Sequence, residues 1–256
     1  LKTHAKMLLI TRRDKRTGQL QRYGHLSTGN YNARSARLYT DLSHLTCDAA
    51  ITEDMDAVFR HLSSHNRLPT LQQLVMAPFH LHSHMLERIG QAASAAAKGK
   101  DARIVLKMNA LTDEVLIAAL IDAGALGVQI DLIVRGACML PAQVPGRTEN
   151  IRVRSVIGRF LEHTRVFYFA WGTHEEVYLS SADWMHRNML RRVELAWPVH
   201  QRKLRQRIID ECLADYLHDD RNAWQLQSDG CYQPPMRPSA GFGAQNMLMK
   251  NYGGAA

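Results

Sequence analysis

The same short pattern occurs twice in this chain, and the repeat limits the folds that are open to it. A histidine and a cation stand two residues apart in His4-Ala-Lys6 and again in His163-Thr-Arg165. Each pair leads into an apolar run typical of a β-strand, and each run is followed by a polar loop. The repeat predicts one site that is built from two related halves.

The order of apolar runs and helical periodicities indicates an α/β fold, with a mixed sheet and helices on both faces. Between Leu74 and Val134 strands and helices alternate, as in a largely parallel sheet. Met7 to Thr11 predicts a buried strand of a hairpin, and Thr52 and Thr112 are the expected caps of two helices. Further strands are expected at Gln21 to Leu26, Arg103 to Met108, Val128 to Val134, Ile151 to Ser155, Arg165 to Phe169, Glu176 to Ser180 and Val193 to Ala196, and a long helix at His200 to about His218.

We expect two domains and a tail. Residues 1–68 form the C-terminal part of a first domain, and the polar stretch Ser63 to Pro69 marks its boundary. Residues 69–227 form a second, nearly complete domain. Residues 228–256 are rich in Gly and Pro and are expected to form a poorly ordered tail.

Composition narrows the partners and the compartment. A net charge of +8 and a pI near 9.5 favour polyanionic partners. The four cysteines are far apart and are expected to be reduced thiols of a cytoplasmic protein, with membrane association left open. No apolar run approaches the roughly 20 residues that span a bilayer. Because the chain starts at Leu1 without an initiator Met, we expect a fragment of a longer protein.

The repeated pattern suits phosphoryl chemistry. Alternate side chains of a strand share a face, so His4 and Lys6 are expected to point the same way, as are His163 and Arg165. A neutral imidazole can attack phosphorus while fixed cations stabilise the transferring group, and the second imidazole can act as acid or base. The alternative is that both pairs stand by chance on strand edges.

Two loops and one arginine extend this prediction. The loops Ser27–Asn32 and Ser180–Asn188 carry the small hydroxyl and amide residues of turns that direct N–H groups at an anion, although they could also be ordinary turns. Arg135 follows the apolar strand Ile130 to Val134, where ligands of open α/β sheets bind. The alternative for Arg135 is a surface arginine paired with a carboxylate.

These residues resemble a known family, the bacterial polyphosphate kinases of the first type, whose C-terminal half is a pair of phospholipase-D-like domains. The resemblance extends over at least Lys2 to Asp219. Its motifs are Lys2-Thr-His4-Ala-Lys6, His25-Leu-Ser-Thr-Gly-Asn-Tyr31, Ala36-Arg-Leu-Tyr39-Thr-Asp41, Ile130-Asp-Leu-Ile-Val-Arg135-Gly136, Glu149-Asn-Ile-Arg152-Val-Arg-Ser155, Phe160-Leu-Glu-His163 and Tyr178-Leu-Ser-Ser-Ala-Asp183-Trp184-Met.

The resemblance implies a function and the residues that perform it. His4 would be the residue autophosphorylated by ATP, and His163 the second catalytic histidine, which contacts nucleotide phosphate. Tyr39, Arg135 and Lys6 would bind the nucleotide and its phosphates. The implied reaction is reversible transfer of the terminal phosphoryl group of ATP to polyphosphate, with Mg²⁺ held mainly by residues upstream of this chain. A homo-oligomer is expected, and nucleic acid is not an expected partner.

The chain also departs from the family pattern. Ser27 stands where relatives commonly have Gly, so the loop backbone is expected to be less free to adopt a positive φ. His80, His82 and His84 stand where relatives usually have Asn or Arg; they are expected at the surface, with a metal site as the alternative. Two upstream arginines of the family lie outside this chain, so we expect the isolated polypeptide to lack activity.

Two other function classes remain open. A phospholipase-D-like phosphodiesterase or nuclease would use the same paired histidines, but it normally carries Asp five residues after the Lys, where this chain has Thr11. A non-catalytic polyanion-binding module would need the positive charge and not the histidines. His25 is either a supporting polar residue of the first loop or purely structural.

Overall fold

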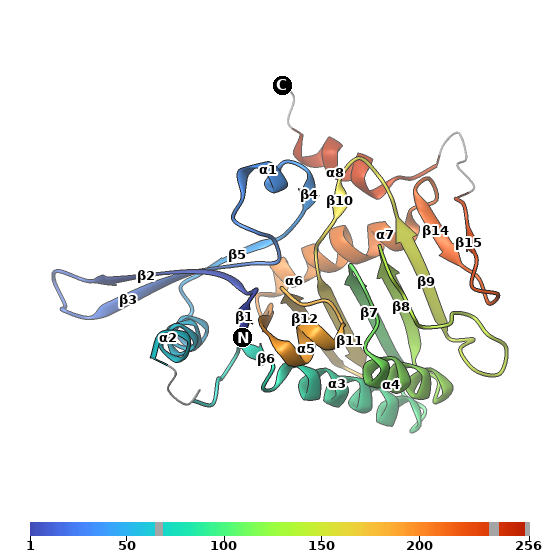
Figure 1. The fold of residues 1–256 in the computed structure, drawn as a ribbon, viewed down its shortest axis with the longest axis horizontal. Helices are drawn as coiled ribbons and strands as arrows, with labels where there is room; N and C mark the ends of the chain where they lie inside the picture. Colours follow the sequence, from blue (N-terminus) through green and yellow to red (C-terminus); the bar gives the residue numbers. More distant parts are fainter. Residues whose placement is uncertain (65–68, 236–240, 254–256) are drawn as a thin grey trace.

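A mixed ten-stranded sheet organises the computed structural model of this chain, which describes residues 1–64, 69–235 and 241–253 (Figure 1). Its path is β1-β13-β12-β11-β7-β8-β9-β14-β15, and β6 pairs with β13 beside β1. The strands are β1 (Lys2–Thr3), β6 (Val75–Ala77), β7 (Ala102–Met108), β8 (Gln129–Val134), β9 (Ile151–Val156), β11 (Val166–Trp171), β12 (His174–Ser180), β13 (Arg192–Pro198), β14 (Ala223–Leu226) and β15 (Tyr232–Gln233).

The sheet is less parallel than the sequence suggests. The strands β7, β8 and β9 pair in parallel, whereas β11 pairs antiparallel with both β7 and β12. Gly172 and Thr173 connect β11 to β12, and Gly172 has a φ of 56°. A two-residue turn joins only antiparallel strands, and it needs a positive φ that glycine adopts without strain. The expected mixed sheet is therefore confirmed, but the largely parallel order is not.

Helices cover both faces of the sheet, as expected for this α/β class. One face packs against α3 (Leu81–Ala96) and α4 (Glu114–Ala125). The other packs against a continuous helical run made of α6 (Arg202–Ile208), the π-helix η1 (Ile209–Ala214) and α7 (Asp215–His218). Burial on both faces explains why β8 is apolar apart from Gln129 and Asp131.

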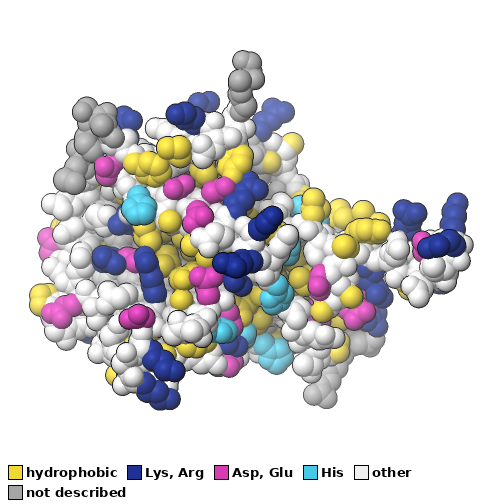
Figure 2. All heavy atoms as spheres, turned by 180° about the vertical axis from the view of Figure 1, so that it is seen from behind, with side chains coloured by type: hydrophobic (Ala, Val, Ile, Leu, Met, Phe, Trp, Pro, Cys, Tyr) yellow, Lys and Arg dark blue, Asp and Glu magenta, His cyan; other side chains and the backbone are white. Residues whose placement is uncertain are grey.

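Residues 1–64 contribute a smaller sheet and a projecting hairpin. The strands β2 (Lys6–Arg13), β3 (Leu20–Ser27) and β5 (Ser43–Thr46) pair antiparallel, and α2 (Ala49–Ser64) packs against one face. The predicted hairpin is confirmed, but its first strand is not buried, because Leu8 and Ile10 lie on the open face. Figure 2 shows hydrophobic side chains on this hairpin and basic side chains at its tip.

Two predicted helix caps are wrong, Thr52 by four residues and Thr112 by one residue. The helix α2 begins at Ala49, and the Asp48 carboxylate accepts from the Ile51 amide at 3.0 Å; Thr52 lies inside the helix and donates to the Asp48 carbonyl. At α4 the cap is Asp113, whose carboxylate accepts from the Leu116 amide. In both cases a carboxylate, the stronger acceptor near a helix N-terminus, takes the place expected for threonine.

The C-terminal residues also differ from their expectation. Beyond residue 228 the described part contains β15 and the helix α8 (Ala244–Tyr252), and Ala244 and Gln245 are buried. A buried apolar side chain and a hydrogen-bonded amide fix this segment, so its described part is not a loose tail. The predicted boundary at Ser63 to Pro69 includes residues 65–68, which lie outside the described residues, and the two-domain division stays a prediction. Within the described ranges, no helix is long and apolar enough to cross a membrane.

Candidate active site

Both histidine motifs lie where the chain crosses from one sheet to another. His4 and Ala5 separate β1, in the large sheet, from β2, in the small one, and both their amides bond the Val193 carbonyl. His163 to Arg165 separate β10 (Leu161–Glu162) from β11, and β10 pairs in parallel with β4 (Tyr39–Thr40). The expectation that each pair lies within one strand is therefore wrong, although each cation still contacts its histidine.

Each histidine is held by a carboxylate from the other half of the chain. His4 Nδ1 lies 2.8 and 2.9 Å from the two carboxylate oxygens of Glu194, in β13. His163 Nδ1 lies 2.9 and 3.0 Å from those of Asp41, which follows β4. An ionised carboxylate can only accept, so each Nδ1 carries the proton and each Nε2 keeps its lone pair. Both imidazoles are thereby oriented and prepared to act as a nucleophile or a base through Nε2.

The two Ser-containing loops hold these carboxylates in matching ways. In the first loop, Thr28 Oγ1 donates to Asp41 at 2.7 Å and accepts from the Leu42 amide. In the second, Ser181 Oγ donates to Glu194 at 2.5 Å and accepts from the Leu195 amide. The loop hydroxyls thus orient the groups that orient the histidines. The predicted aim of backbone N–H groups at an anion is not tested by these contacts.

The residues on either side of these hydroxyls are also matched. Ser27 Oγ accepts from the Gly29 amide, and Ser180 Oγ accepts from the Ala182 amide, both at 3.0 Å. Among the described residues other than glycine, Gln143 is the one with a positive φ. The φ of Ser27 is therefore not positive, and a glycine is not needed at this position. A Cβ at Gly29 would collide with the Asp41 carboxyl, whereas the corresponding Ala182 is accommodated. In the first loop the space for a Cβ is therefore lacking at Gly29, two residues after Ser27.

Two buried cations lie beside the histidines. Lys6 Nζ is 2.9 Å from both ring nitrogens of His4, so it does not lie along the lone pair of either. Burial of Lys6 lowers its pKa to about 8, against the opposing effect of Glu194. Arg165 Nη1 is 3.1 Å from His163 Nε2, and the same guanidinium binds both oxygens of Asp183. Burial alone would raise the pKa of Asp183, but the Arg165 guanidinium holds it below its usual value.

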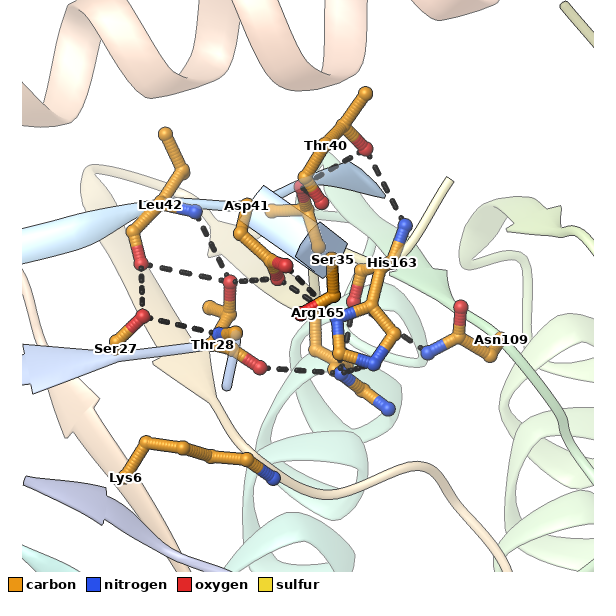
Figure 3. A network of polar contacts seen from close by, with 12 residues as sticks. Lys6, Ser27, Thr28, Ser35, Thr40, Asp41, Leu42, Asn109, His163 and Arg165 are labelled. Atoms are coloured by element: carbon orange, nitrogen blue, oxygen red, sulfur yellow. Dashed lines mark hydrogen bonds and ion pairs between the residues drawn. The ribbon is translucent and has the colours of Figure 1, made fainter. Parts of the chain in front are cut away.

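The contacts join the two halves into one site (Figure 3). The charges of Arg165, Asp41 and Asp183 all influence the pKa of Lys6, which therefore lies among groups of both halves. Arg165 also donates to the Thr28 carbonyl at 3.2 Å. Lys6, which contacts His4, is thus coupled electrostatically to the groups around His163. This arrangement can place two imidazoles and two cations around a single phosphoryl group.

The other predicted site residues differ in their contacts with the groups around the two histidines. Tyr39 packs against the His163 ring with 5.1 Å between centroids. Arg135 follows β8 and donates to the Glu162 carbonyl at 2.6 Å and to the Asn109 side chain at 3.0 Å, and within the described ranges it pairs with no carboxylate. His25 bonds the Tyr31 hydroxyl on the open face of the hairpin, at 2.8 Å.

Of the three histidines expected at the surface, His80, His82 and His84, two are partly buried and have partners. His82 pairs with Asp113 at 3.0 Å, and His84 bonds the Tyr178 hydroxyl at 3.1 Å; both are half-buried, whereas His80 is exposed. His80 and His84 line a cavity of about 640 Å³ at the start of β12, whereas the active site lies at its end. Over the described ranges, no group of three or more His, Cys, Asp or Glu residues could hold a metal ion.

Sequence reasoning missed the carboxylates that orient the two histidines. Asp41 lies in a motif quoted for the family, yet no role was assigned to it. Glu194 carries a clearer signal, because it is a charged residue inside the buried strand Val193 to Ala196. A carboxylate in such a place needs a partner, and a search for the cation or donor that pairs with it would have led to His4.

Comparisons with known proteins match nearly the whole chain. The family model "Polyphosphate kinase C-terminal domain 1" matches residues 1–68, and "Polyphosphate kinase C-terminal domain 2" matches residues 74–245. The polyphosphate kinase of Burkholderia cenocepacia is 53% identical over 234 residues, which are 91% of this chain and 34% of that protein. The polyphosphate kinase of Paraburkholderia phytofirmans is 50% identical over 98% of this chain and 37% of its own length.

A solved structure agrees with these matches. The crystal structure of polyphosphate kinase from Porphyromonas gingivalis superposes with a TM-score of 0.91 at 35% identity, over 99% of this chain and 39% of that one. The chain thus spans a little over a third of the length of the relatives it matches.

Proposed function

This chain belongs to the polyphosphate kinase family, and from that premise we propose that it forms the phosphoryl-transfer site of an enzyme that moves the terminal phosphoryl group of ATP reversibly to inorganic polyphosphate. The observation that carries the proposal is the crossed pairing of each histidine with a carboxylate of the other half. ATP, ADP and polyphosphate are the proposed partners. We keep a cytoplasmic location and a homo-oligomer as expectations.

In the proposed first step, His4 Nε2 attacks the terminal phosphorus of ATP. The N–P bond forms as the bond from phosphorus to the ADP oxygen breaks, and ADP leaves. Glu194 keeps the Nδ1 proton in place and stabilises the positive charge that develops on the ring. Lys6 and Arg165 stabilise the charge on the transferring oxygens. In the second step, a terminal oxygen of polyphosphate attacks the phosphohistidine, and His4 departs as the neutral imidazole.

The proposed roles of the remaining residues follow from their positions. In this proposal His163 acts from the opposite side as acid or base and would contact nucleotide phosphate, with Asp41 supplying for it the orientation that Glu194 supplies for His4. Tyr39, beside the His163 ring, and Arg135, at the end of β8, would bind the nucleotide and its phosphates.

The carboxylates of the described site already accept hydrogen bonds or pair with cations, so these residues do not by themselves fit a magnesium site. Mg²⁺ would have to enter with the ATP phosphates or be held by residues outside this chain. We derive no step through it.

The test is to incubate the natural protein that contains this chain with γ-labelled ATP and to map the label. An acid-labile label on His4 that disappears in His4→Gln, and that polyphosphate removes, is the expected result. Absence of the label from His4 would refute the mechanism. Polyphosphate binding that survives in the double variant His4→Ala/His163→Ala, without any phosphorylated intermediate in the wild type, would instead favour a non-catalytic polyanion-binding module.

A further inference from the structure

The residue that precedes His163 is the centre of a buried polar network. Both oxygens of Glu162, which is 4% exposed, are fully occupied. Oε1 accepts from the Tyr216 hydroxyl at 2.9 Å and from the Gln245 amide at 2.5 Å. Oε2 accepts from the Thr40 hydroxyl at 2.9 Å and lies 2.8 Å from Lys107 Nζ. A buried carboxylate is tolerated only when paired and hydrogen-bonded, and this one has four donors from four separate elements.

This network reaches the active site through short backbone connections. The Thr40 hydroxyl that donates to Glu162 also accepts from the His163 amide at 3.2 Å. Thr40 stands between Tyr39, which packs on the His163 ring, and Asp41, which holds its Nδ1. Arg135 donates to the Glu162 carbonyl. The Glu162 carboxylate therefore fixes the strands β4 and β10, which carry the groups on both sides of the His163 imidazole.

The C-terminal helix closes the network. The Gln245 amide nitrogen donates to Glu162 and to the Phe160 carbonyl, and its oxygen accepts from the Phe160 amide at 2.9 Å. Gly158 leaves the space that this amide occupies, because a Cβ there would collide with it. Gln245 thus binds the segment before His163 from the side, in the way that a neighbouring strand would.

We propose that Glu162 and Gln245 are positioning residues that hold the His163 side of the active site, so that the helix α8 is required for phosphoryl transfer although it contacts no catalytic atom. The inference rests on the proposed function. It assigns a role to a segment that the sequence predicted to be poorly ordered. Neither side chain touches His4, Glu194 or Ser181, so the His4 side of the site keeps its own support.

The test uses Gln245→Glu, which keeps the shape and places a second carboxylate against Glu162. Two carboxylates at hydrogen-bond distance share one proton, so their joint apparent pKa rises, whereas Glu162 alone is held ionised mainly by Lys107 against the effect of burial. Other titratable groups facing the pair are Tyr216 and Cys212. We expect kcat to fall by roughly 10- to 100-fold at alkaline pH and to recover as the pH falls.

Two further variants separate positioning from folding. Tyr252→Phe removes the hydrogen bonds that the Tyr252 hydroxyl of α8 makes with Arg207 and Glu211 and leaves Glu162 untouched, so kcat should not change. Tyr216→Phe removes one donor to Glu162 without adding a charge, and should lower kcat at every pH with KM little changed. Thermal unfolding at each assay pH verifies that the variants are folded.

The outcomes distinguish this inference from the function on which it rests. If wild-type protein gives no label on His4, the proposed function fails. If wild-type protein is labelled, and Gln245→Glu and Tyr216→Phe both keep wild-type kcat across the pH range, the positioning role is wrong. If Gln245→Glu does not fold, unchanged kcat in Tyr216→Phe alone overturns the inference.

Discussion

The two hairpins that follow the histidine motifs have very different surroundings and deliver the same local geometry. The hairpin β11–β12 lies inside the ten-stranded sheet, and Phe167 and Phe169 are fully buried there. The hairpin β2–β3 projects from the molecule (Figure 1), and several of its hydrophobic side chains are exposed. Yet each hairpin begins where the chain crosses between sheets. Each ends in a loop whose hydroxyl group donates to the carboxylate that pairs with a histidine. The geometry of the site is therefore set at the ends of the hairpins nearest to it.

The largest expected effect on activity comes from replacing the carboxylates that pair with the histidines. Glu194 and Asp41 are expected to affect different steps, which distinguishes the two halves of the site. Glu194→Gln keeps the shape but no longer favours the Nδ1 proton on His4, so the rate of His4 labelling should fall by roughly 100- to 10,000-fold. In Asp41→Asn the label on His4 should still form, and its transfer should be slowed. Rapid-quench measurement of labelled protein separates the two steps. Equal effects of both variants on label formation would show that the halves are not specialised.

A smaller effect is expected at the glycine that breaks the local symmetry. Gly29→Ala places a Cβ against the Asp41 carboxyl, and such overpacking typically costs about 1–3 kcal/mol. The variant should displace Asp41 and reduce activity together with the unfolding midpoint. Ala182→Gly, at the matched position, should cost at most about 1 kcal/mol of backbone entropy. A Gly29→Ala protein with wild-type activity and stability would mean that the first loop relaxes freely.

Much of the fold and part of the site could be predicted from the sequence. The strands β7 and β8 were located to within about one residue, because both are apolar runs bounded by polar or glycine-containing segments. The caps at Asp48 and Asp113 could not be located to the residue, since neighbouring threonines and aspartates are both good caps. The histidines and cations were found as a repeat, but Asp41 and Glu194 were not, because each partner lies more than a hundred residues away in the chain.

The two cations should respond differently to pH. The folded-state pKa of Lys6, about 8, lies below its ordinary value of 10.5, so its charge is present below about pH 8 and is lost above it. Activity that needs this charge should fall as the pH rises through about 8. Folding stability should change in the opposite direction over the same range, because burial favours the neutral amine. Lys6→Arg should move the alkaline limb of the kcat profile upward by at least one pH unit, since arginine stays protonated.

An unmoved alkaline limb in Lys6→Arg would assign that limb to another group. Because Arg165 occupies the corresponding place in the second half, Arg165→Lys is the matched control. Arg165→Lys should introduce a second alkaline limb into the pH profile of kcat without moving the limb that belongs to Lys6.

The smallest effect is expected on the open face of the projecting hairpin. Ile10 is 55% exposed, so Ile10→Thr keeps the β-branched shape of a strand residue and should change the free energy of unfolding by no more than about 0.5 kcal/mol. Phe169, four residues after Arg165 as Ile10 is after Lys6, has no exposed surface and serves as the buried control: Phe169→Ala should be destabilising. Urea unfolding of both variants measures the difference. A loss of more than about 1.5 kcal/mol in Ile10→Thr would mean that this face is covered in the natural protein, and that the two hairpins are more alike in their surroundings than this chain alone indicates.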